Sequence, residues 1–186
     1  MYKIVQWHES LDLTDFYTKA ARRGFVNNSS QRAMIDCFQN EREWRVWILY
    51  YNDIAIGSVA AHSIDEGYRI CARTCVLSDL LPLPALRTRN QIITHQHVTA
   101  QFLMPICIEW VGNKGDMYIT SHPSDVGTQR LVHTVWGPSL EKTGVLTRSF
   151  EKEYRGHVQT FWKIDQNIFL DQLSRVKSWV TLTQPN

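Results

Sequence analysis

The chain has 186 residues, 44% hydrophobic and 20% charged, which are the proportions of one globular domain with a substantial core. Its formal net charge of +2 and its scattered Lys and Arg residues argue against a nucleic-acid-binding face. The N-terminus contains no apolar signal region, and no segment approaches the roughly 18 apolar residues of a membrane span. These features predict a cytoplasmic protein without membrane contacts.

Apolar periodicity predicts a strand, two helices and three further strands in the first half of the chain. Ser10 is expected to cap the first helix, and Asn40 to end the second. The three strands should form an antiparallel meander, because turn residues such as Asn52-Asp53 separate them. The predicted elements are, in chain order, a strand over 2–7, helices over about 11–24 and 31–40, and strands over 44–51, 54–62 and 68–77.

The second half begins with the irregular segment 78–86, whose two prolines predict an extended path. A long helix should follow, kinked or divided at Pro105. A final hairpin should turn at 153–156, with Gly156 at a positive φ, and Asp165 or Asn167 should cap the last helix. The predicted elements are a helix over 89–110, a strand over 117–121, a helix over 128–142 interrupted at Gly137-Pro138, strands over 145–152 and 157–164, and a C-terminal helix.

The four cysteines have neither C-x-x-C spacing nor the density of a disulfide scaffold. Cys71 and Cys75 are four positions apart on a predicted strand, which would place them on the same side of it. No neighbouring histidine pair completes a zinc set. We therefore predict buried free thiols and no metal site.

This order of elements resembles the GNAT acyltransferase superfamily over residues 2–165. Leu140-Glu141-Lys142-Thr143-Gly144-Val145 is similar to the family's helix-end pattern of tyrosine, glutamate, lysine, any residue, glycine and phenylalanine. The final hairpin also stands where the family has its last two strands. The resemblance implies an α/β fold in one domain, with a mixed, mostly antiparallel sheet of six to seven strands flanked by helices. Residues 1–165 would form the core of that domain, and residues 166–186 its C-terminal helix and tail.

The family transfers an acyl group, usually acetyl, from coenzyme A to an amine. The resemblance therefore implies acetyl-CoA or another acyl-CoA as co-substrate. The counterpart of the strand that offers its backbone to the pantetheine arm is 68–77, which makes Val76 and Leu77 candidate binding residues. The counterpart of the pyrophosphate loop, which precedes a helix N-terminus, adds five candidates: Arg87, Thr88, Arg89, Asn90 and Gln91.

Three positions depart from the family pattern. Asn90 and Ile92 replace the two motif glycines, and the β-branched Ile92 obstructs a close backbone approach. Arg87 and Arg89 could grip phosphate instead through their guanidinium groups. Leu140 stands where many members have the tyrosine that protonates the leaving thiolate, and leucine cannot donate a proton.

The catalytic groups therefore stay unassigned. Candidates for the general acid are Tyr118 and Tyr154. The candidates for the general base that fall near the expected cleft are His62, Cys75, Asp79 and His122. Three further histidines, on predicted helices without a partner at metal-ligand spacing, are interpreted as packing or surface residues: His95, His97 and His133.

The sequence thus leaves three hypotheses: an acyl-CoA-dependent N-acyltransferase, a GNAT-like binding or assembly module without catalysis, and a different α/β fold with the same element order. Loss of the two glycines and the tyrosine favours the module. The tolerance of the family for variation in this loop favours the enzyme. The partners would be a coenzyme A thioester and an amine of unidentified class, and the edges of the last hairpin favour a homodimer.

Overall fold

The computed structural model describes residues 2–24, 30–77, 80, 98–120 and 137–176. They form one seven-stranded sheet in the order β1-β2-β3-β4-β5-β7-β6. All neighbouring strands are antiparallel except β4 and β5, so the prediction of a mixed, mostly antiparallel α/β sheet is confirmed. The strands are β1 (Tyr2–Gln6), β2 (Trp44–Tyr51), β3 (Ile54–Ile64), β4 (Gly67–Val76), β5 (Met117–Ile119), β6 (Leu146–Tyr154) and β7 (His157–Ile164).

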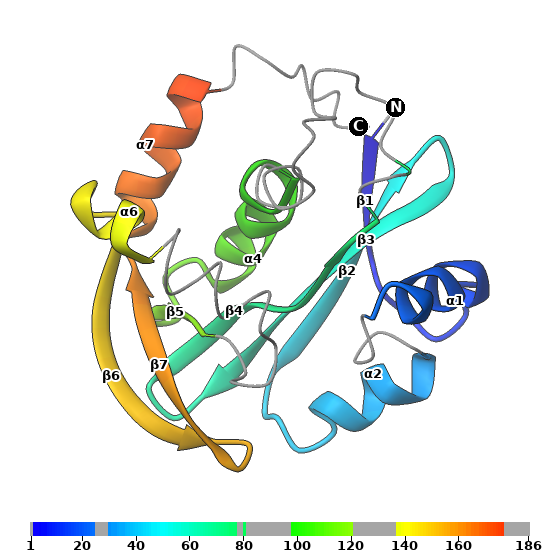
Figure 1. The fold of residues 1–186 in the computed structure, drawn as a ribbon, viewed down its shortest axis with the longest axis horizontal. Coiled ribbons are helices and arrows are strands. Elements are labelled where there is room, and N and C mark those ends of the chain that lie inside the picture. The colour runs from blue at the N-terminus through cyan, green and yellow to red at the C-terminus, as the bar shows by residue number, and fades with distance from the viewer. Residues whose placement is uncertain (1, 25–29, 78–79, 81–97, 121–136, 177–186) are drawn as a thin grey trace.

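Helices cover both faces of the sheet (Figure 1). One face carries the two N-terminal helices, whose Phe16, Met34 and Phe38 are buried against β2, β3 and β4. The other face carries the middle and C-terminal helices, with Phe102 and Phe169 in its core. The helices are α1 (Thr14–Arg22), α2 (Gln31–Phe38), the π-helix η3 (Thr99–Leu103), α4 (Met104–Val111), α6 (Gly137–Lys142) and α7 (Gln166–Val176). In the part of the chain that the structure describes, no helix is long and apolar enough to cross a membrane.

The N-terminal caps of α1 and α2 differ. The prediction that Ser10 caps α1 is wrong, because Ser10 Oγ is bonded to His8 Nδ1 at 2.8 Å and lies four residues before the helix. Asp12 Oδ1 instead accepts the N–H of Thr14 at 3.1 Å. In α2, Ser30 Oγ accepts the N–H of Ala33 at 3.1 Å, as expected of an N-cap.

The predicted antiparallel meander of β2, β3 and β4 is confirmed, but β4 contains an irregularity that its sequence did not predict. Arg69 pairs with His62, Ala72 with Ala60 and Cys75 with Ser58, so β4 carries one extra residue in each of the two intervals. Cys71 and Arg73 have the positive φ values of 54° and 53°. These are β-bulges, which bend a strand and change the side to which the following residues point.

The bulge at Arg73 overturns the prediction that Cys71 and Cys75 share one side. Cys75 packs with the α1–α2 face, whereas Cys71 packs against the α4 face. Cys75 and Cys107 are buried free thiols as predicted, but Cys37 and Cys71 are partly exposed. An extra residue between two positions of a strand inverts their alternation, which is why the spacing was misleading.

The long middle helix is divided at the predicted place. Its described part changes from the π-helix η3 to the α-helix α4 at Met104, and Pro105 stands in the first turn of α4. Because η3 runs directly into α4 and the N–H of Met104 donates to the carbonyl of Thr99, Pro105 lies within a continuous helix, where its missing N–H interrupts the hydrogen-bond pattern. Gly137-Pro138 begins α6.

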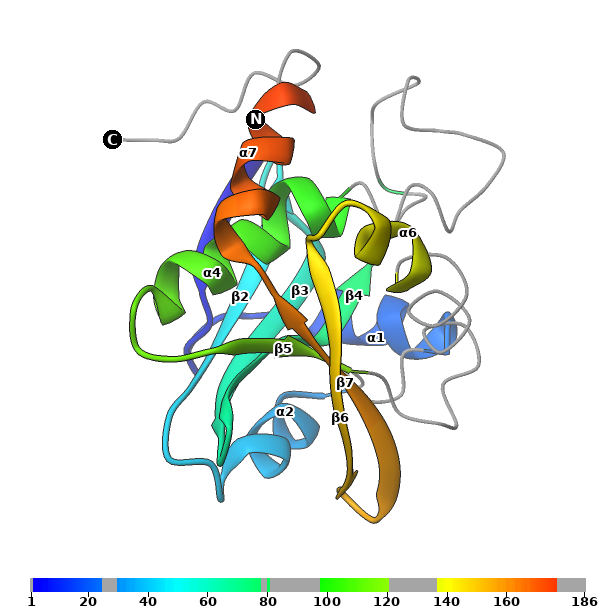
Figure 2. The same ribbon diagram turned by 90° about the vertical axis from the view of Figure 1, so that its left-hand side faces the viewer.

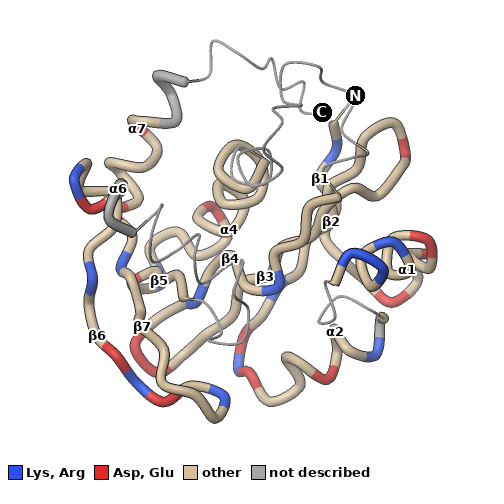
Figure 3. Tube along the Cα trace, viewed as in Figure 1, with Lys and Arg blue, Asp and Glu red and all other residues tan. Residues whose placement is uncertain are grey.

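The β6–β7 hairpin is longer than predicted. Glu153 and Tyr154 continue β6 and pair with β7, so the turn consists of Arg155 and Gly156 alone, with φ values of 53° and 78°. A two-residue turn with both φ angles positive matches the twist of the flanking strands. Figure 2 shows the hairpin extending beyond the sheet toward the end where α2 lies. Charged residues of both signs lie along it (Figure 3). At the other end of β7, Asp165 caps α7 through the N–H of Ile168.

Candidate functional site

The parallel strands β4 and β5 are joined over a short distance only. Tyr68 pairs with Met117 and Arg69 with Tyr118, and Ile119 then pairs with Trp162 of β7. Among the described residues, β4 has no β5 partner from Ile70 onward. The described ladder between β4 and β5 therefore covers two residue pairs, and the bulges at Cys71 and Arg73 lie beyond it.

Val76 and Leu77 lie at the open end of β4. Both side chains are buried, on opposite faces of the sheet. The N–H of Leu77 donates to the carbonyl of Ile56 at 2.8 Å, which commits Leu77 to β3. Because backbone groups alternate in direction along a strand, the N–H and C=O of Val76 point away from β3, toward the edge that β5 leaves free. The backbone there is oriented as a pantetheine-binding strand requires, and the binding role itself remains a prediction.

Several predicted site residues lie outside the described residues. They are the loop candidates Arg87, Thr88, Arg89, Asn90 and Gln91, the obstructing Ile92, the base candidates Asp79 and His122, and His95, His97 and His133.

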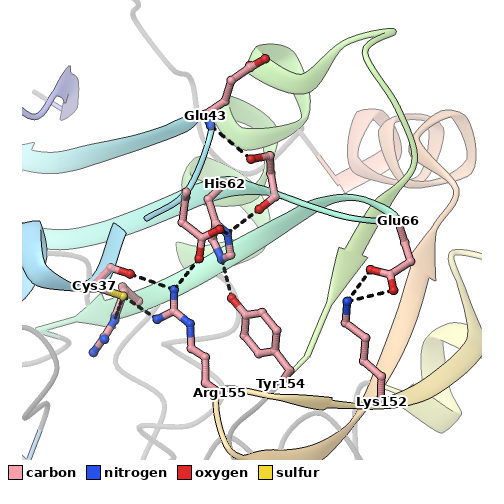
Figure 4. A network of polar contacts seen from close by, with 10 residues as sticks. Cys37, Glu43, His62, Glu66, Lys152, Tyr154 and Arg155 are labelled. Atoms are coloured by element: carbon pink, nitrogen blue, oxygen red, sulfur yellow. Dashed lines mark hydrogen bonds and ion pairs between the residues drawn. The ribbon is translucent and has the colours of Figure 1, made fainter. Parts of the chain in front are cut away.

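At the joined end of β4, polar side chains from three separate regions meet on the α1–α2 face (Figure 4). One group comes from α2 and the residues after it, one from β3 and β4, and one from the tip of the β6–β7 hairpin. We call this set the hairpin cluster; it consists of Cys37, Glu41, His62, Arg69, Arg73, Tyr154 and Arg155.

Two of the sequence candidates, His62 and Tyr154, are hydrogen-bonded to each other. Tyr154 Oη lies 3.1 Å from His62 Nε2, and the two rings are nearly parallel, with an interplanar angle of 19°. His62 Nδ1 lies 3.0 Å from the carbonyl of Ser63. A carbonyl only accepts hydrogen bonds, so Nδ1 must carry the proton and Nε2 must accept the Tyr154 hydroxyl. The geometry thus selects one tautomer and one direction of donation.

His62 and Glu41 have perturbed acidities. The His62 side chain is fully buried, and this burial lowers the pKa of the imidazole below its usual range, although Glu41 opposes the change with Oε2 at 3.5 Å from Nδ1. Burial alone would raise the pKa of Glu41, but its hydrogen bonds and ion pairs with His62 and Arg155 outweigh that effect and lower it. At neutral pH the site therefore contains a neutral imidazole beside an ionised carboxylate.

Arg155 fastens the hairpin tip to the end of α2. Its two terminal nitrogens donate to Cys37 Sγ at 2.7 Å, to the Cys37 carbonyl at 2.9 Å and to Glu41 Oε1 at 2.9 Å. Burial opposes the charge, yet the partners Cys37, Tyr154 and Glu41 raise the pKa of the guanidinium further. Arg73 Nε donates to the same sulfur at 2.9 Å. The Cys37 thiol, which was predicted to be buried, is partly exposed and accepts hydrogen bonds from two cations.

The remaining sequence candidates are placed less favourably for proton transfer. Cys75 is fully buried, and burial raises its pKa to about 12. Tyr118 lies in an aromatic cluster with Phe150 and Phe161, and burial raises its pKa. Leu140 packs against the core beside α4. Among the described residues, no three His, Cys, Asp or Glu side chains are arranged to hold a metal ion.

Sequence reasoning identified His62 and Tyr154 but missed Glu41, Arg69, Arg73 and Arg155. The positions of the arginines on one strand and one turn were visible in the sequence, yet their convergence depends on two β-bulges and on the bend of the hairpin. The one local signal was the Arg155-Gly156 turn, which lies beside a tyrosine.

No protein-family model and no curated protein matches the sequence. Solved structures do match. FeeM, an N-acyl amino acid synthase from uncultured soil microbes, is 8% identical with a TM-score of 0.53, over 97% of this chain and 99% of that one. The ribosomal-protein-S18-alanine N-acetyltransferase from Escherichia coli is 9% identical with a TM-score of 0.50, over 88% of this chain and 93% of that one.

A GNAT family acetyltransferase from Elizabethkingia anophelis, solved with acetyl-CoA bound, is 12% identical with a TM-score of 0.47, over 88% of this chain and 97% of that one. The protein has the GNAT fold. The short ladder between β4 and β5 and the β6–β7 hairpin are therefore parts of a GNAT fold. The resemblance inferred from the order of the elements is confirmed at the level of the fold.

Proposed function

We propose that the protein is an N-acyltransferase that transfers an acyl group from a coenzyme A thioester to an amine. The single observation that carries this proposal is the hydrogen bond between the partly exposed Tyr154 and the buried His62, close to the place where the described β4–β5 ladder ends. It is supported by the GNAT fold, which the FeeM synthase and the S18-alanine acetyltransferase share.

The coenzyme would lie along the open edge of β4. Its pantetheine arm would hydrogen-bond to the free backbone groups near Val76 and Leu77. Its pyrophosphate would lie farther out, held by Arg87, Thr88, Arg89, Asn90 and Gln91, with the arginines replacing the interactions that the motif glycines would otherwise allow. The thioester would then point toward the joined end of β4, where the hairpin cluster lies.

The reaction consists of one substitution at the thioester carbonyl. The amine nitrogen attacks the carbonyl carbon, the C–N bond forms, and the C–S bond breaks. The nitrogen loses one proton and the departing sulfur gains one, so a neutral amine and the thioester give an amide and free coenzyme A. The protein has to accept the proton from nitrogen and return one to sulfur.

Tyr154 is suited to that transfer because its hydroxyl already donates to an unprotonated imidazole nitrogen. When the hydroxyl oxygen accepts a proton from the amine, its own proton passes to His62 Nε2. The ionised Glu41 beside Nδ1 stabilises the imidazolium that results. When the C–S bond breaks, Nε2 returns this proton through the Tyr154 hydroxyl to the departing sulfur, and the side chains regain their starting states. His62 is fully buried and acts through Tyr154, which makes it a positioning residue.

The test is a calorimetric titration with acetyl-CoA. We expect a dissociation constant below about 1 mM for the natural sequence, and a clearly weaker one for Arg87→Ala and Arg89→Ala. Arg148→Ala is the matched control, because Arg148 is exposed on β6 and paired with Glu151. A folded protein that releases no heat at high ligand concentration would contradict the proposal and leave the non-catalytic module.

A further inference from the structure

We infer that the hairpin cluster binds a carboxylate, and that the amine acceptor is therefore a small molecule carrying both an amino and a carboxylate group. The part of the inference that concerns acyl transfer rests on the proposed function, whereas the binding of a carboxylate does not. It starts from the charges of the cluster, whose members include three arginines and one carboxylate, that of Glu41.

The three guanidinium groups lie close together. Those of Arg73 and Arg155 both donate to Cys37 Sγ, at 2.9 and 2.7 Å, so the two donor nitrogens lie no farther apart than the sum of these distances, 5.6 Å. The guanidinium carbons of Arg69 and Arg155 lie 5.2 and 5.3 Å from the centroid of the Tyr154 ring. Like charges at such distances repel, and the cost is large where solvent is restricted.

Among the described residues, Arg69 and Arg155 have one carboxylate partner between them, Glu41. Glu41 accepts one hydrogen bond from Arg155 at 2.9 Å, and Cys37 contributes a sulfur, which is a weak acceptor. Arg69 Nε is buried and has no hydrogen-bond partner among the described residues. Burial lowers the pKa of Arg69, and the nearby charge of Arg155 lowers it further. One more anion would remove this imbalance.

A carboxylate fits the place better than a bulky anion. Guanidinium groups bind carboxylates through two parallel hydrogen bonds, and Arg155 already donates to the Glu41 carboxylate at 2.9 Å. The side chains remain accessible, since Arg155 is 31% and Glu41 22% exposed.

The position also accounts for the amine. The guanidinium groups of Arg69 and Arg155 both lie near the Tyr154 ring, so an amine a few bonds from a carboxylate bound by either arginine would lie near Tyr154. An amino acid has this arrangement of groups. The arginines would then select and orient the acceptor, and Tyr154 would take its proton.

The experiment compares matched acceptors in the full chain. Each pair consists of an L-amino acid and its carboxamide, with small, aromatic and acidic side chains represented, and free coenzyme A is measured after addition of acetyl-CoA. We expect a kcat/KM about tenfold or more higher for the acid, mainly through KM, since charge-assisted bonds to the carboxylate are lost in the amide. Arg73→Gln and Arg155→Gln should reduce this ratio to about one to three.

Arg148→Gln is the control, because it removes a guanidinium from the same hairpin outside the cluster and should leave the ratio unchanged. Circular dichroism checks that each variant folds. If Arg155→Gln does not fold, the ratio of kcat/KM for acid and carboxamide in the natural sequence tests the inference. Equal rates for acid and amide, or a preference for a phosphorylated amine over its carboxylate counterpart, would overturn the inference.

A binding measurement separates this inference from the proposed function. The N-acetylated forms of the same amino acids and amides are titrated without any acyl donor. Tighter binding of the acids, lost in Arg155→Gln, would support the carboxylate site even if no transfer were detected. Transfer to amines without any acid preference would support the enzyme and refute the site.

Discussion

The two ends of β4 are built in different ways. At the joined end, Gly67 to Arg69 lie between β3 and β5, and their surroundings contribute charged and hydrogen-bonding side chains. At the open end, Cys75, Val76 and Leu77 are apolar and buried, and among the described residues β4 pairs there with β3 alone, so its polar resources are backbone groups. One strand can therefore present backbone groups at one end and a side-chain cluster at the other, and the bulges between the two ends change the side to which its residues point.

The joined end depends most strongly on one glycine. Gly67 has a φ of 146°, and a Cβ placed there would lie 2.4 Å from the carbonyl oxygen of Asp116, which leads into β5. Gly67→Ala should lower the free energy of unfolding by about 3 kcal/mol or more, through strain and displacement of a backbone segment. Gly156→Ala, with positive φ but no atom within 4 Å, should cost about 1 kcal/mol. Urea denaturation of both variants measures the difference, and equal losses would contradict the packing described.

The chemistry of the joined end is tested at Tyr154. Tyr154→Phe keeps the ring and its packing but removes the hydroxyl that donates to His62, so kcat should fall on the order of 100-fold. Tyr118→Phe is the control, since Tyr118 lies in the neighbouring aromatic cluster and its kcat effect should stay within about threefold. The measurement is the release of coenzyme A across pH. An unchanged rate and pH profile in Tyr154→Phe would remove Tyr154 from the mechanism.

The attachment of the hairpin to α2 should have a moderate energy. Arg155→Gln removes the donors to Cys37 and Glu41, and we expect a loss of about 1–2 kcal/mol in unfolding free energy. Arg148→Gln breaks an exposed ion pair with Glu151 and should change stability by less than about 0.5 kcal/mol. Thermal denaturation distinguishes the two. If both variants melt together with the natural protein, Arg155 does not fasten the hairpin.

The smallest expected effect is a pH dependence of stability. Burial lowers the pKa of His62 in the folded state, so the unfolded chain binds the proton first as the pH falls. The stabilisation is complete above the unfolded-state value of about 6.5 and is lost as the pH falls toward and through the lowered folded-state pKa.

His62→Gln should therefore flatten the stability curve between about pH 7 and pH 5, by up to about 1 kcal/mol. His157→Gln, at an exposed position of the same hairpin, should leave its shape unchanged. Chemical denaturation at a series of pH values provides the curves. A slope that survives in His62→Gln would assign the dependence to other groups.

The order of the helices and strands could be predicted from the sequence, because it depends on local periodicity and on the residues that form turns. The alternation in 44–51, the positive φ at Gly156 and the cap at Asp165 each depend on a few neighbouring residues, and all three were predicted correctly. His62 and Tyr154 could also be named as candidates, since a titratable side chain is visible at its position.

The contact between His62 and Tyr154 follows only from the tertiary structure. His62 and Tyr154 are 92 positions apart, and Cys37 and Arg155 are 118 apart. Such contacts follow from the places where β4 gains two extra residues and where the hairpin bends, and neither is encoded in a local pattern. A bulge inverts which side of the sheet a residue faces, so side-chain chemistry can be read from the sequence while its direction and its neighbours cannot.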